Sequence, residues 1–554
     1  MSEAWLLVAR VLAGGRAAWV AAVGLATAAA IAAHGLTTVR PVGVTRDDAE
    51  YLAYALALLG GLGFVDPAAP DTPPAARYPI GYPLLLAGVL RVAPEPITAA
   101  LALGPACVMV ALIAGWHLMR RVGGLGPWWA TALTALAALD VTRHEFAATT
   151  RSDVPFAALV GVALLVLDRP LREPRPGDAS RWLWGGLLVA SATLVRTAGW
   201  ALVLGLVWVA WRRGRLREAW PAAVPVVTLV GGWMAYDAQR GAASYGATFA
   251  ATMPQGVDGW LARVSMVVGQ LVGGDLAACL WPLKGFGGGW AVAVAAVVAG
   301  VALVGTGRWL WRPAGFAPGT ELPAAFAAAT VGMSLVWSLG FVQFAPGVQA
   351  RFLFPAAPAL AIAAWGLGRL AWRGGRVQAW VRWVGGVGLV AAIALSAWSF
   401  HLHPVGQALF GPGRQALLVR KADWDRLFAA VRSHVPPRGR VLSQHHVMIW
   451  LYTGRQGYSL PLVVDAAGTF APLPAGDTAH FLRDHPVGYL ALTPSTDQAP
   501  NVTAVSFNPL LRACPDAFAP SWLAPGGLFG LLRVDDAAFG ACTGAATPAR
   551  AGEP

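Results

Sequence analysis

The sequence predicts a mainly helical, polytopic membrane protein with a small α/β domain at its C-terminal end. Of its 554 residues, 56% are hydrophobic and only 12% are charged, whereas soluble domains carry about 25% charged residues. Apolar runs long enough to cross a bilayer as a helix recur up to His401, after which the hydropathy falls. This composition excludes a soluble enzyme and a disordered chain.

The net charge of +13 does not indicate a protein that binds nucleic acid. The arginines lie in short clusters between apolar runs, and no basic stripe interleaves with aromatic residues. Membrane topology explains the charge better, because basic residues collect on the cytoplasmic side of membrane proteins. The 26 tryptophans also fit a protein with two membrane interfaces.

The apolar runs divide into about 11 predicted transmembrane helices. One run extends from Trp182 to Trp211 and is interrupted at Arg196–Thr197. We divide it into two spans, because the charges of all later loops then agree with one topology. The predicted spans are 17–36, 97–119, 126–142, 153–168, 182–196, 198–211, 219–236, 286–307, 322–344, 352–371 and 383–402.

The distribution of charge predicts which way the spans face. With a cytoplasmic N-terminus, arginine clusters such as Arg120–Arg121 fall on the inner side of every turn, and acids such as Asp47 and Asp153 fall outside. The membrane domain, residues 1–402, then has two long outer loops, 37–96 and 237–285. We therefore expect a multi-pass protein of the plasma membrane whose chemistry lies on the outer face of the cell envelope.

The C-terminal segment, residues 403–554, is predicted to be an extracytoplasmic α/β domain. In an oxidising compartment its Cys514 and Cys542 can form a disulfide, but their spacing does not decide this. The adjacent His445 and His446 have no evident third metal ligand and are interpreted as surface or packing residues. The predicted elements are a strand from Val441, a helix over His446–Tyr452 ended at Gly454, a strand over Tyr458–Val464, a helix over Asp477–Arg483 and a strand over Val487–Leu492.

The first outer loop contains the most informative residues. A helix is predicted from the Thr45–Asp48 cluster to Gly60, and it places Asp48, Tyr51 and Leu52 on one face. Asp47 and Asp48 alone fit a helix N-cap and its dipole. After a proline-rich stretch, the loop ends in Arg77-Tyr-Pro-Ile-Gly-Tyr-Pro83, whose prolines suit the first turn of a short interfacial helix.

This combination resembles the GT-C superfamily of polytopic glycosyltransferases, in its protein-O-mannosyltransferase and aminoarabinose-transferase branch. Those enzymes have an acidic pair in the first outer loop, a helix of the form Asp-x-x-Tyr-x-x-x-Ala and a Pro-Pro-x-Tyr-Pro-like element. The matching stretches here are Asp48-Ala-Glu-Tyr51 with Ala55, and Tyr78-Pro-Ile-Gly-Tyr-Pro83. The chain departs from the pattern at Ile80-Gly81, which replaces the first proline of the usual pair.

The resemblance implies a hexosyl or pentosyl glycosyltransferase that moves a sugar from a polyprenyl-phosphate donor to an acceptor hydroxyl by inverting displacement. A hydroxyl needs a general base, and a phosphate leaving group needs cations. The base is Asp48 or Asp47, and the family spacing to the tyrosine favours Asp48. Asp153 matches a further acidic residue of the family and is expected to be catalytic, although it also fits a helix N-cap. The residues expected to bind substrate are Tyr51, Arg77, Tyr78, Tyr82, Arg143, Arg151, Arg196, Lys284 and Arg351.

Several of these cations have a second interpretation. Arg196 is costly at the end of a span without a partner, so it either binds the lipid phosphate or forms a structural ion pair. Arg143 and Arg151 either hold phosphate or pair with Glu145 and Asp153. Lys284 and Arg351 also fit as interface anchors.

The sequence leaves several functional questions open. A glycan, a lipid or a protein all remain as acceptors, membrane lipids are expected partners, and nucleic acid is not. No metal-ligand cluster is evident, and the sequence neither requires nor excludes a divalent metal. The alternative function is a polytopic transporter or lipid flippase, against which the lack of an internal repeat and the charges at span ends argue.

Overall fold

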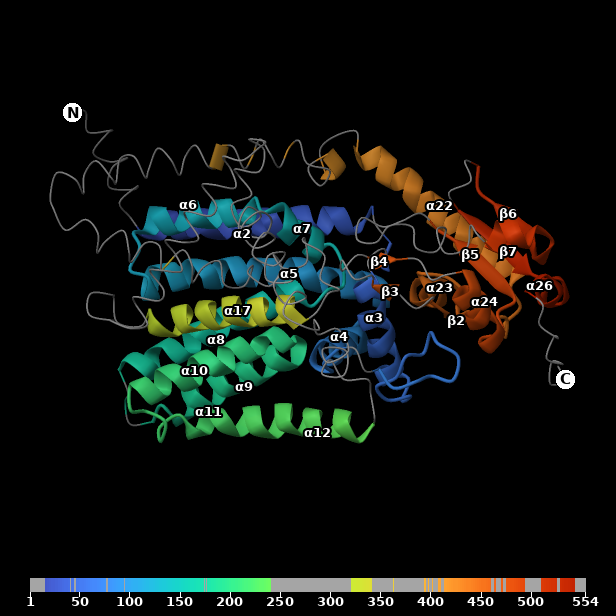
Figure 1. Ribbon diagram of the computed structural model, residues 1–554. Coiled ribbons are helices and arrows are strands. Elements are labelled where there is room, and N and C mark those ends of the chain that lie inside the picture. Colours follow the sequence, from blue (N-terminus) through green and yellow to red (C-terminus); the bar gives the residue numbers. More distant parts are fainter. Residues whose placement is uncertain are drawn as a thin grey trace, which may run out of the picture. The chain divides into compact units, whose positions relative to one another are not determined.

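The computed structural model shows a helical part and a smaller α/β part (Figure 1). The predicted spans 286–307, 352–371 and 383–402 lie wholly or almost wholly outside the described residues, as do Arg77, Lys284 and Arg351. The described residues are 15–39, 41–43, 46–75, 78–93, 95–173, 175, 177–240, 320–340, 362, 393–394, 397, 401, 407–409, 413–459, 463–464, 470–471, 475–493, 510–525 and 529–543.

The chain forms two compact units. The helical unit comprises Met1–Thr37, Ala76–Leu85 and Pro94–Gly413, and the tail unit comprises Thr38–Ala75, Leu86–Ala93 and Arg414–Pro554. Most of the first long loop, residues 38–75 and 86–93, therefore groups with the tail, and residues 76–85 group with the helices.

The helical unit is a bundle, and its described helices match the predicted spans in order. Three of them, Gly15–Thr37, Ile97–Val122 and Asp153–Arg172, are long and apolar enough to cross a membrane within the described part of the chain. The helices are α2 (Gly15–Thr37), α5 (Pro96–His117, continued by a π-turn over Leu118–Val122), α6 (Pro127–Ala138), α7 (Val141–Ala147), α8 (Asp153–Arg172), α9 (Ala179–Val195), α10 (Trp200–Arg212), α11 (Trp220–Pro225), α12 (Gly232–Gln239) and α17 (Glu321–Gly340).

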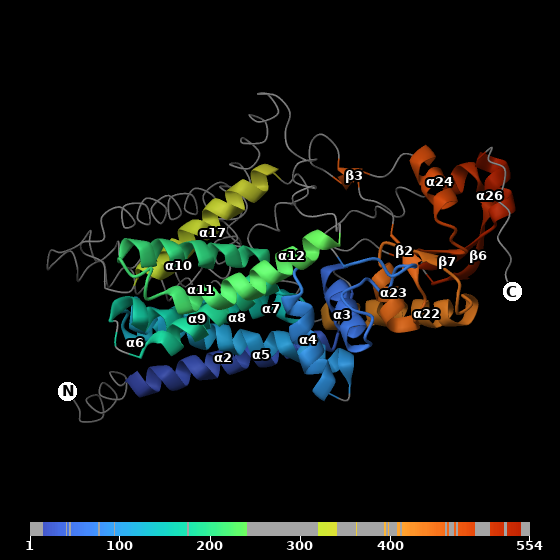
Figure 2. The same cartoon turned by 90° about the horizontal axis from the view of Figure 1, so that it is seen from below.

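Small residues allow these helices to approach closely. Helix α2 buries a stripe of alanines, among them Ala26, Ala29 and Ala33, against Val108 and Leu112 of α5. The two helices lie side by side in Figure 1 and Figure 2. Membrane helices associate through such small-residue contacts, because lipid provides little hydrophobic driving force between them.

The predicted interruption between the fifth and sixth spans is confirmed. Helix α9 ends at Val195, Arg196 is extended (φ −154°, ψ 133°), and a short 3₁₀ turn over Thr197–Gly199 leads into α10. A Cβ on Gly199 would lie 2.5 Å from the backbone of Thr193, so only glycine fits this turn. The break places an arginine exactly between two apolar helices.

A five-stranded sheet with the order β2-β1-β5-β7-β6 forms the centre of the tail unit. Strands β2, β1 and β5 pair in parallel, and β5, β7 and β6 pair antiparallel. A separate antiparallel pair is formed by β3 and β4. The strands are β1 (Val441–Leu442), β2 (Gly457–Tyr458), β3 (Val463–Val464), β4 (Phe470–Ala471), β5 (Tyr489–Leu492), β6 (Phe518–Leu523) and β7 (Gly530–Val534).

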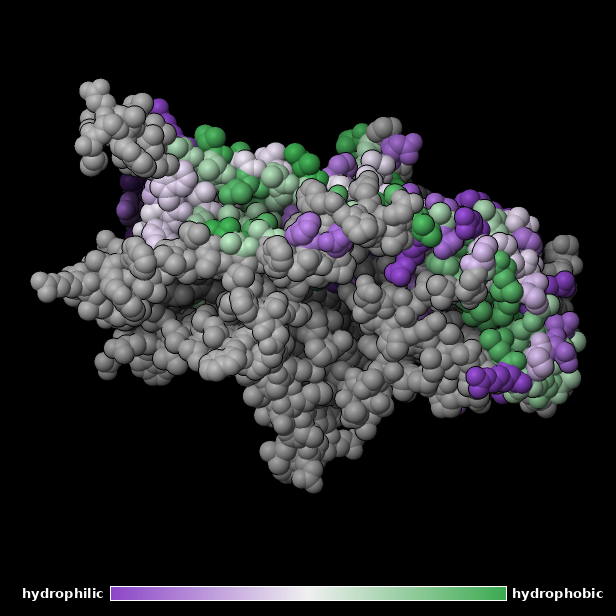
Figure 3. Space-filling view, turned by 90° about the horizontal axis from the view of Figure 1, so that it is seen from above, coloured by the Kyte–Doolittle hydropathy of each residue, from purple (hydrophilic) through white to green (hydrophobic). Residues whose placement is uncertain are grey.

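Helices cover both faces of this sheet, as the alternation of side chains along each strand requires. Val441 and Leu531 belong to one hydrophobic cluster, and their neighbours Leu442 and Leu532 belong to the other. The first cluster contains residues of α22 (Gly413–His434) and α23 (His446–Thr453), and the second contains residues of α24 (Ala475–Asp484) and α26 (Asp536–Thr543). In Figure 3, hydrophilic and hydrophobic side chains alternate over the tail unit, and pale or hydrophobic ones predominate over the described helices of the other unit.

Most of the elements predicted for the tail are confirmed. Helix α23 ends at Gly454, whose φ of +71° is the left-handed C-cap expected of glycine. The single strand predicted over Tyr458–Val464 is wrong, because this segment holds β2 and β3, which belong to different sheets. Pro461 lies between them in the sequence and cannot donate to a ladder, which favours two short strands over one long strand.

A disulfide joins Cys514 and Cys542, which resolves the question that the sequence left open. We expect Cys542→Ser to lower the free energy of unfolding of the tail unit by about 3 kcal/mol, because the bond closes a loop across a sequence separation of 28 residues. Thermal unfolding of the full chain should give the same midpoint for reduced wild type and for Cys542→Ser. Equal midpoints for oxidised wild type and the variant would contradict this expectation.

Candidate functional site

The acidic pair lies in the first turn of α3 (Arg46–Leu59), where the helix dipole favours negative charge. Asp48 is fully buried. Its Oδ2 accepts the amide hydrogen of Gly43 at 3.0 Å, and its Oδ1 accepts that of Ala49 at 2.9 Å. Asp47 is partly exposed. The structure thus separates two neighbouring carboxylates into one that organises the backbone and one that solvent reaches.

Tyr51 follows on α3 and is buried, as is Leu52. The predicted common face of Asp48, Tyr51 and Leu52 is therefore the inner face of this helix within the tail unit. The helix ends at Leu59 and is followed by Gly60, as the sequence predicted. Of the two acids in the first turn of α3, Asp47 has the partly exposed side chain and Asp48 the buried one.

Asp153 is the centre of an ion-pair cluster in the helical unit. It lies in the first turn of α8 with its side chain 2% exposed. Its Oδ1 lies 2.8 Å from Nη1 of Arg196, and its Oδ2 lies 3.3 Å from Nε of Arg151. Arg196 also donates to Oγ of Ser152 at 3.3 Å. The pairing of Arg151 with Asp153 is one of the two interpretations that the sequence left open, and Arg196 joins this pair from the break between α9 and α10.

In this cluster the carboxylate of Asp153 lies against two guanidinium groups, those of Arg151 and Arg196. Arg151 also lies over the ring of Phe146, 4.2 Å from its centroid. Planar guanidinium groups match the geometry of phosphate, so these two arginines are of the residue type that binds such an anion.

Arg143 lies on α7, in the hairpin that precedes this cluster. Its side chain is buried, and this burial lowers its pKa to about 10 while the charge of Asp140 opposes the shift. Arg143 therefore stays protonated at neutral pH. The next residue, His144, is held by its Nε2, which lies 2.7 Å from the carbonyl oxygen of Ala138. Burial is the main cause that lowers the pKa of His144 below its usual value, so this ring is neutral at pH 7.

Tyr78 and Tyr82 are buried at the start of α4 (Gly81–Val92). The predicted short helix after the Tyr-Pro element is confirmed, with Pro83 in its first turn. A Cβ on Gly81 would lie 2.6 Å from the backbone of Leu194, so this first turn packs directly against the end of α9. Gly81 belongs to the Ile80-Gly81 departure from the family pattern. It permits the close approach to Leu194, which lies two residues before Arg196 in the sequence.

Sequence reasoning missed the residues that fix the first loop within the tail unit. His445, Tyr452 and Gln456 hydrogen-bond to backbone atoms of residues 42–69. No local pattern in the sequence signals these contacts, because their partners are backbone atoms about 400 positions away. Within the described residues, no group of three or more His, Cys, Asp or Glu side chains has the geometry to hold a metal.

Apolar helices long enough to cross a membrane, together with the small α/β part, define a polytopic membrane fold. Two solved structures of ArnT from Cupriavidus metallidurans share this fold, each with a TM-score of 0.54. The structure with bound undecaprenyl phosphate is 13% identical and covers 92% of this chain and 97% of its own. The apo structure is 15% identical and covers 93% and 98%. No family model matches the sequence, and no curated protein matches it.

Proposed function

We propose that this protein transfers a sugar from a polyprenyl-phosphate donor to an acceptor hydroxyl at the outer face of the plasma membrane. The observation that carries the proposal is the shared fold with ArnT, an aminoarabinose transferase, over nearly the whole length of both chains. One of those structures holds undecaprenyl phosphate, a lipid of the class expected as carrier. Such a transfer needs a base for the hydroxyl and cations for the phosphate.

We assign the general base to Asp47 rather than to Asp48. Both carboxylate oxygens of Asp48 accept backbone amide hydrogens, and its side chain has no exposed surface that an acceptor hydroxyl can approach. Asp47 precedes it in the same turn and is accessible. A general base must come within hydrogen-bond reach of the proton that it removes, and the exposure of Asp47 supports this assignment.

The base removes the proton of the acceptor hydroxyl as its oxygen attacks the anomeric carbon of the donor. The bond from that carbon to the phosphate oxygen breaks, and the bonding pair leaves with the polyprenyl phosphate. One such displacement inverts the anomeric centre.

Arg196 and Arg151 are assigned to the donor phosphate. The negative charge of this group grows as the bond breaks, and fixed cations stabilise it most at that moment. Asp153 is assigned as the positioning residue of the two arginines, because both of its oxygens already lie against guanidinium groups. This assignment replaces the catalytic role that the sequence led us to expect for Asp153.

The experiment that tests the proposal supplies purified protein in lipid nanodiscs with a panel of labelled polyprenyl-phosphate sugars and acceptors. We expect polyprenyl phosphate to be released in step with glycosylated acceptor. Arg196→Ala should weaken donor binding at least tenfold, since hydrogen bonds to charged groups contribute about 1.5–3 kcal/mol. The matched control is Arg172→Ala, an arginine paired with Asp168 at the other end of α8. Unchanged donor affinity in Arg196→Ala would refute the phosphate role.

A further inference from the structure

The backbone just before α3 is fixed to α23 in the tail unit. The hydroxyl oxygen of Tyr452 accepts the amide hydrogen of Val42 at 3.0 Å, and Nδ1 of His445 lies 3.3 Å from the carbonyl oxygen of Gly43. The ring of Tyr452 stacks on Phe428 of α22 at 4.4 Å between centroids, with 4° between the planes. Tyr452 is therefore held by its ring and presents its hydroxyl to the loop.

Gly43 connects this contact to the acidic pair. Its φ of +105° is a conformation that side chains rarely adopt, and a Cβ here would lie 2.6 Å from Cβ and Cγ of Met448 on α23. Its amide hydrogen goes to Asp48, the neighbour of Asp47. The close approach to α23 and the start of α3 thus depend on one backbone position.

The segment after α3 is fixed to the tail in the same way. Nε2 of Gln456 donates to the carbonyl oxygens of Pro67 and Ala69 at 3.1 and 3.2 Å. The backbone N–H of Gly457 donates to the carbonyl oxygen of Ala68 at 2.9 Å. Between these two anchors, α3 packs Ala49 and Ala53 against Val447 of α23, with Trp450 and Leu451 beside them. Helix α3 is held before it, after it and along one face.

We propose that Tyr452 and Gly43 are positioning residues that set the direction of the first turn of α3, and thereby of the Asp47 side chain. This inference rests on the proposed function, in which Asp47 is the base. It gives the tail unit a direct part in catalysis, since a group misplaced by about 1 Å can cost about 100-fold in rate. Burial and the nearby charges of Asp48 and Asp425 raise the pKa of Tyr452 to about 12, so its hydroxyl stays protonated at neutral pH.

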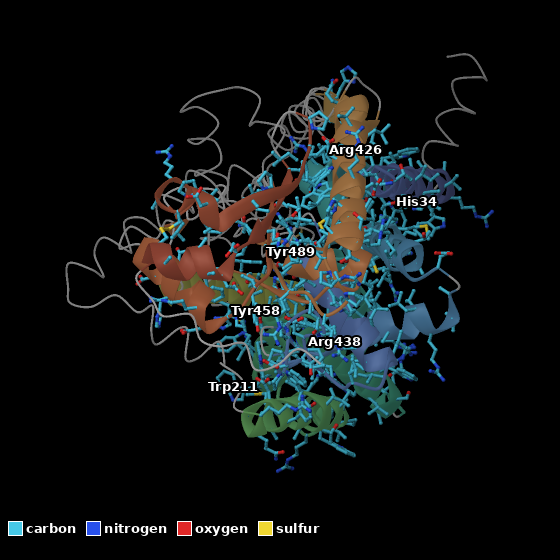
Figure 4. The ribbon with its side chains drawn as sticks, turned by 90° about the vertical axis from the view of Figure 1, so that its right-hand side faces the viewer. His34, Trp211, Arg426, Arg438, Tyr458 and Tyr489 are labelled. Atoms are coloured by element: carbon cyan, nitrogen blue, oxygen red, sulfur yellow. A yellow bond between two sulfur atoms is a disulfide. The ribbon has the colours of Figure 1, made fainter. Side chains whose placement is uncertain are left out.

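The first test removes one hydroxyl. Tyr452→Phe keeps the ring stack and loses the acceptor of the Val42 amide. We expect kcat to fall about tenfold, donor affinity to stay within twofold, and hydrogen exchange of the amides of residues 46–50 to rise about tenfold. The matched control is Tyr489→Phe, labelled in Figure 4. It removes the hydroxyl of a tyrosine on β5 that packs against the hydrophobic cluster containing residues of α22 and α23. It should leave all three quantities unchanged.

The second test uses two glycines at opposite ends of α3. Gly43→Ala introduces both a strained φ and a clash with Met448, whereas Gly61→Ala introduces the strained φ of a +74° position in open space. Both variants pay for backbone strain, but only the first displaces the start of α3 from α23. We expect kcat to fall at least tenfold further in Gly43→Ala than in Gly61→Ala, again with unchanged donor affinity.

The two readouts distinguish this inference from the proposed function. If the wild type is active, the positioning role is overturned when Tyr452→Phe leaves kcat unchanged or leaves the hydrogen exchange of residues 46–50 unchanged. A loss of donor affinity equal to the loss of kcat would overturn it as well, because Tyr452 would then act on the donor. A wild type that turns over no donor would instead overturn the proposed function, and the exchange measurement would still decide whether Tyr452 positions α3.

Discussion

Asp47→Asn is expected to lower kcat by about 100- to 10,000-fold, the range that a general base contributes. Asparagine keeps the shape of the side chain in the first turn of α3 and removes the proton acceptor. Donor affinity and thermal stability should change little, because Asp47 is partly exposed and Asp48 provides the contact with Gly43. The measurement is single-turnover release of polyprenyl phosphate with saturating donor.

Asp48→Asn is the matched comparison for this prediction. Its cost should appear in stability, because an uncharged amide binds the Gly43 and Ala49 amide hydrogens less well and one of its ends is a donor. Activity per folded molecule should fall much less than in Asp47→Asn. A full rate in Asp47→Asn, or a larger loss of kcat in Asp48→Asn, would contradict the assignment of the base.

Asp153→Asn is expected to destabilise the helical unit by about 3–5 kcal/mol. The variant removes the carboxylate that lies against the buried Arg151 and the mostly buried Arg196, and removing one partner of a buried ion pair has a cost of this size. It should also weaken donor binding, since Arg196 loses the group that orients it. Thermal unfolding in nanodiscs, with and without donor, measures both effects.

Asp168→Asn on the same helix provides the control for this loss. Asp168 pairs with Arg172 at 2.6 Å, but that arginine is 23% exposed, so water can replace the lost partner. We expect a smaller loss of stability and unchanged donor binding. Equal losses of stability in the two variants would mean that the Asp153 cluster has no special role in the fold.

Much of the fold follows from patterns that are local in the sequence. Apolar runs of helical length predict the spans, and the polar interruption at Arg196 correctly predicts the break between α9 and α10. Gly454 ends α23 because glycine adopts the left-handed conformation of a helix C-cap without strain. The strand over Tyr458–Val464 was predicted wrongly, because a short apolar run does not reveal which sheet each residue joins.

The candidate site could be predicted in residue type more than in arrangement. The sequence left two interpretations of Arg151 open, phosphate binding or pairing with Asp153, and the structure has the pair. It could not assign Arg196 to the same carboxylate from 43 positions away. It also could not separate Asp47 from Asp48, because that difference depends on Gly43 and on contacts with α23 at the other end of the chain.

The most direct test of the central claim is the stoichiometry of one turnover, followed by mass spectrometry. Wild-type protein in nanodiscs would be mixed with a polyprenyl-phosphate sugar and a panel of acceptors. We predict one polyprenyl phosphate for each glycosylated acceptor, with the anomeric configuration inverted, and no product above background with Asp47→Asn. Intact donor in every mixture, or equal product from Asp47→Asn, would contradict the account.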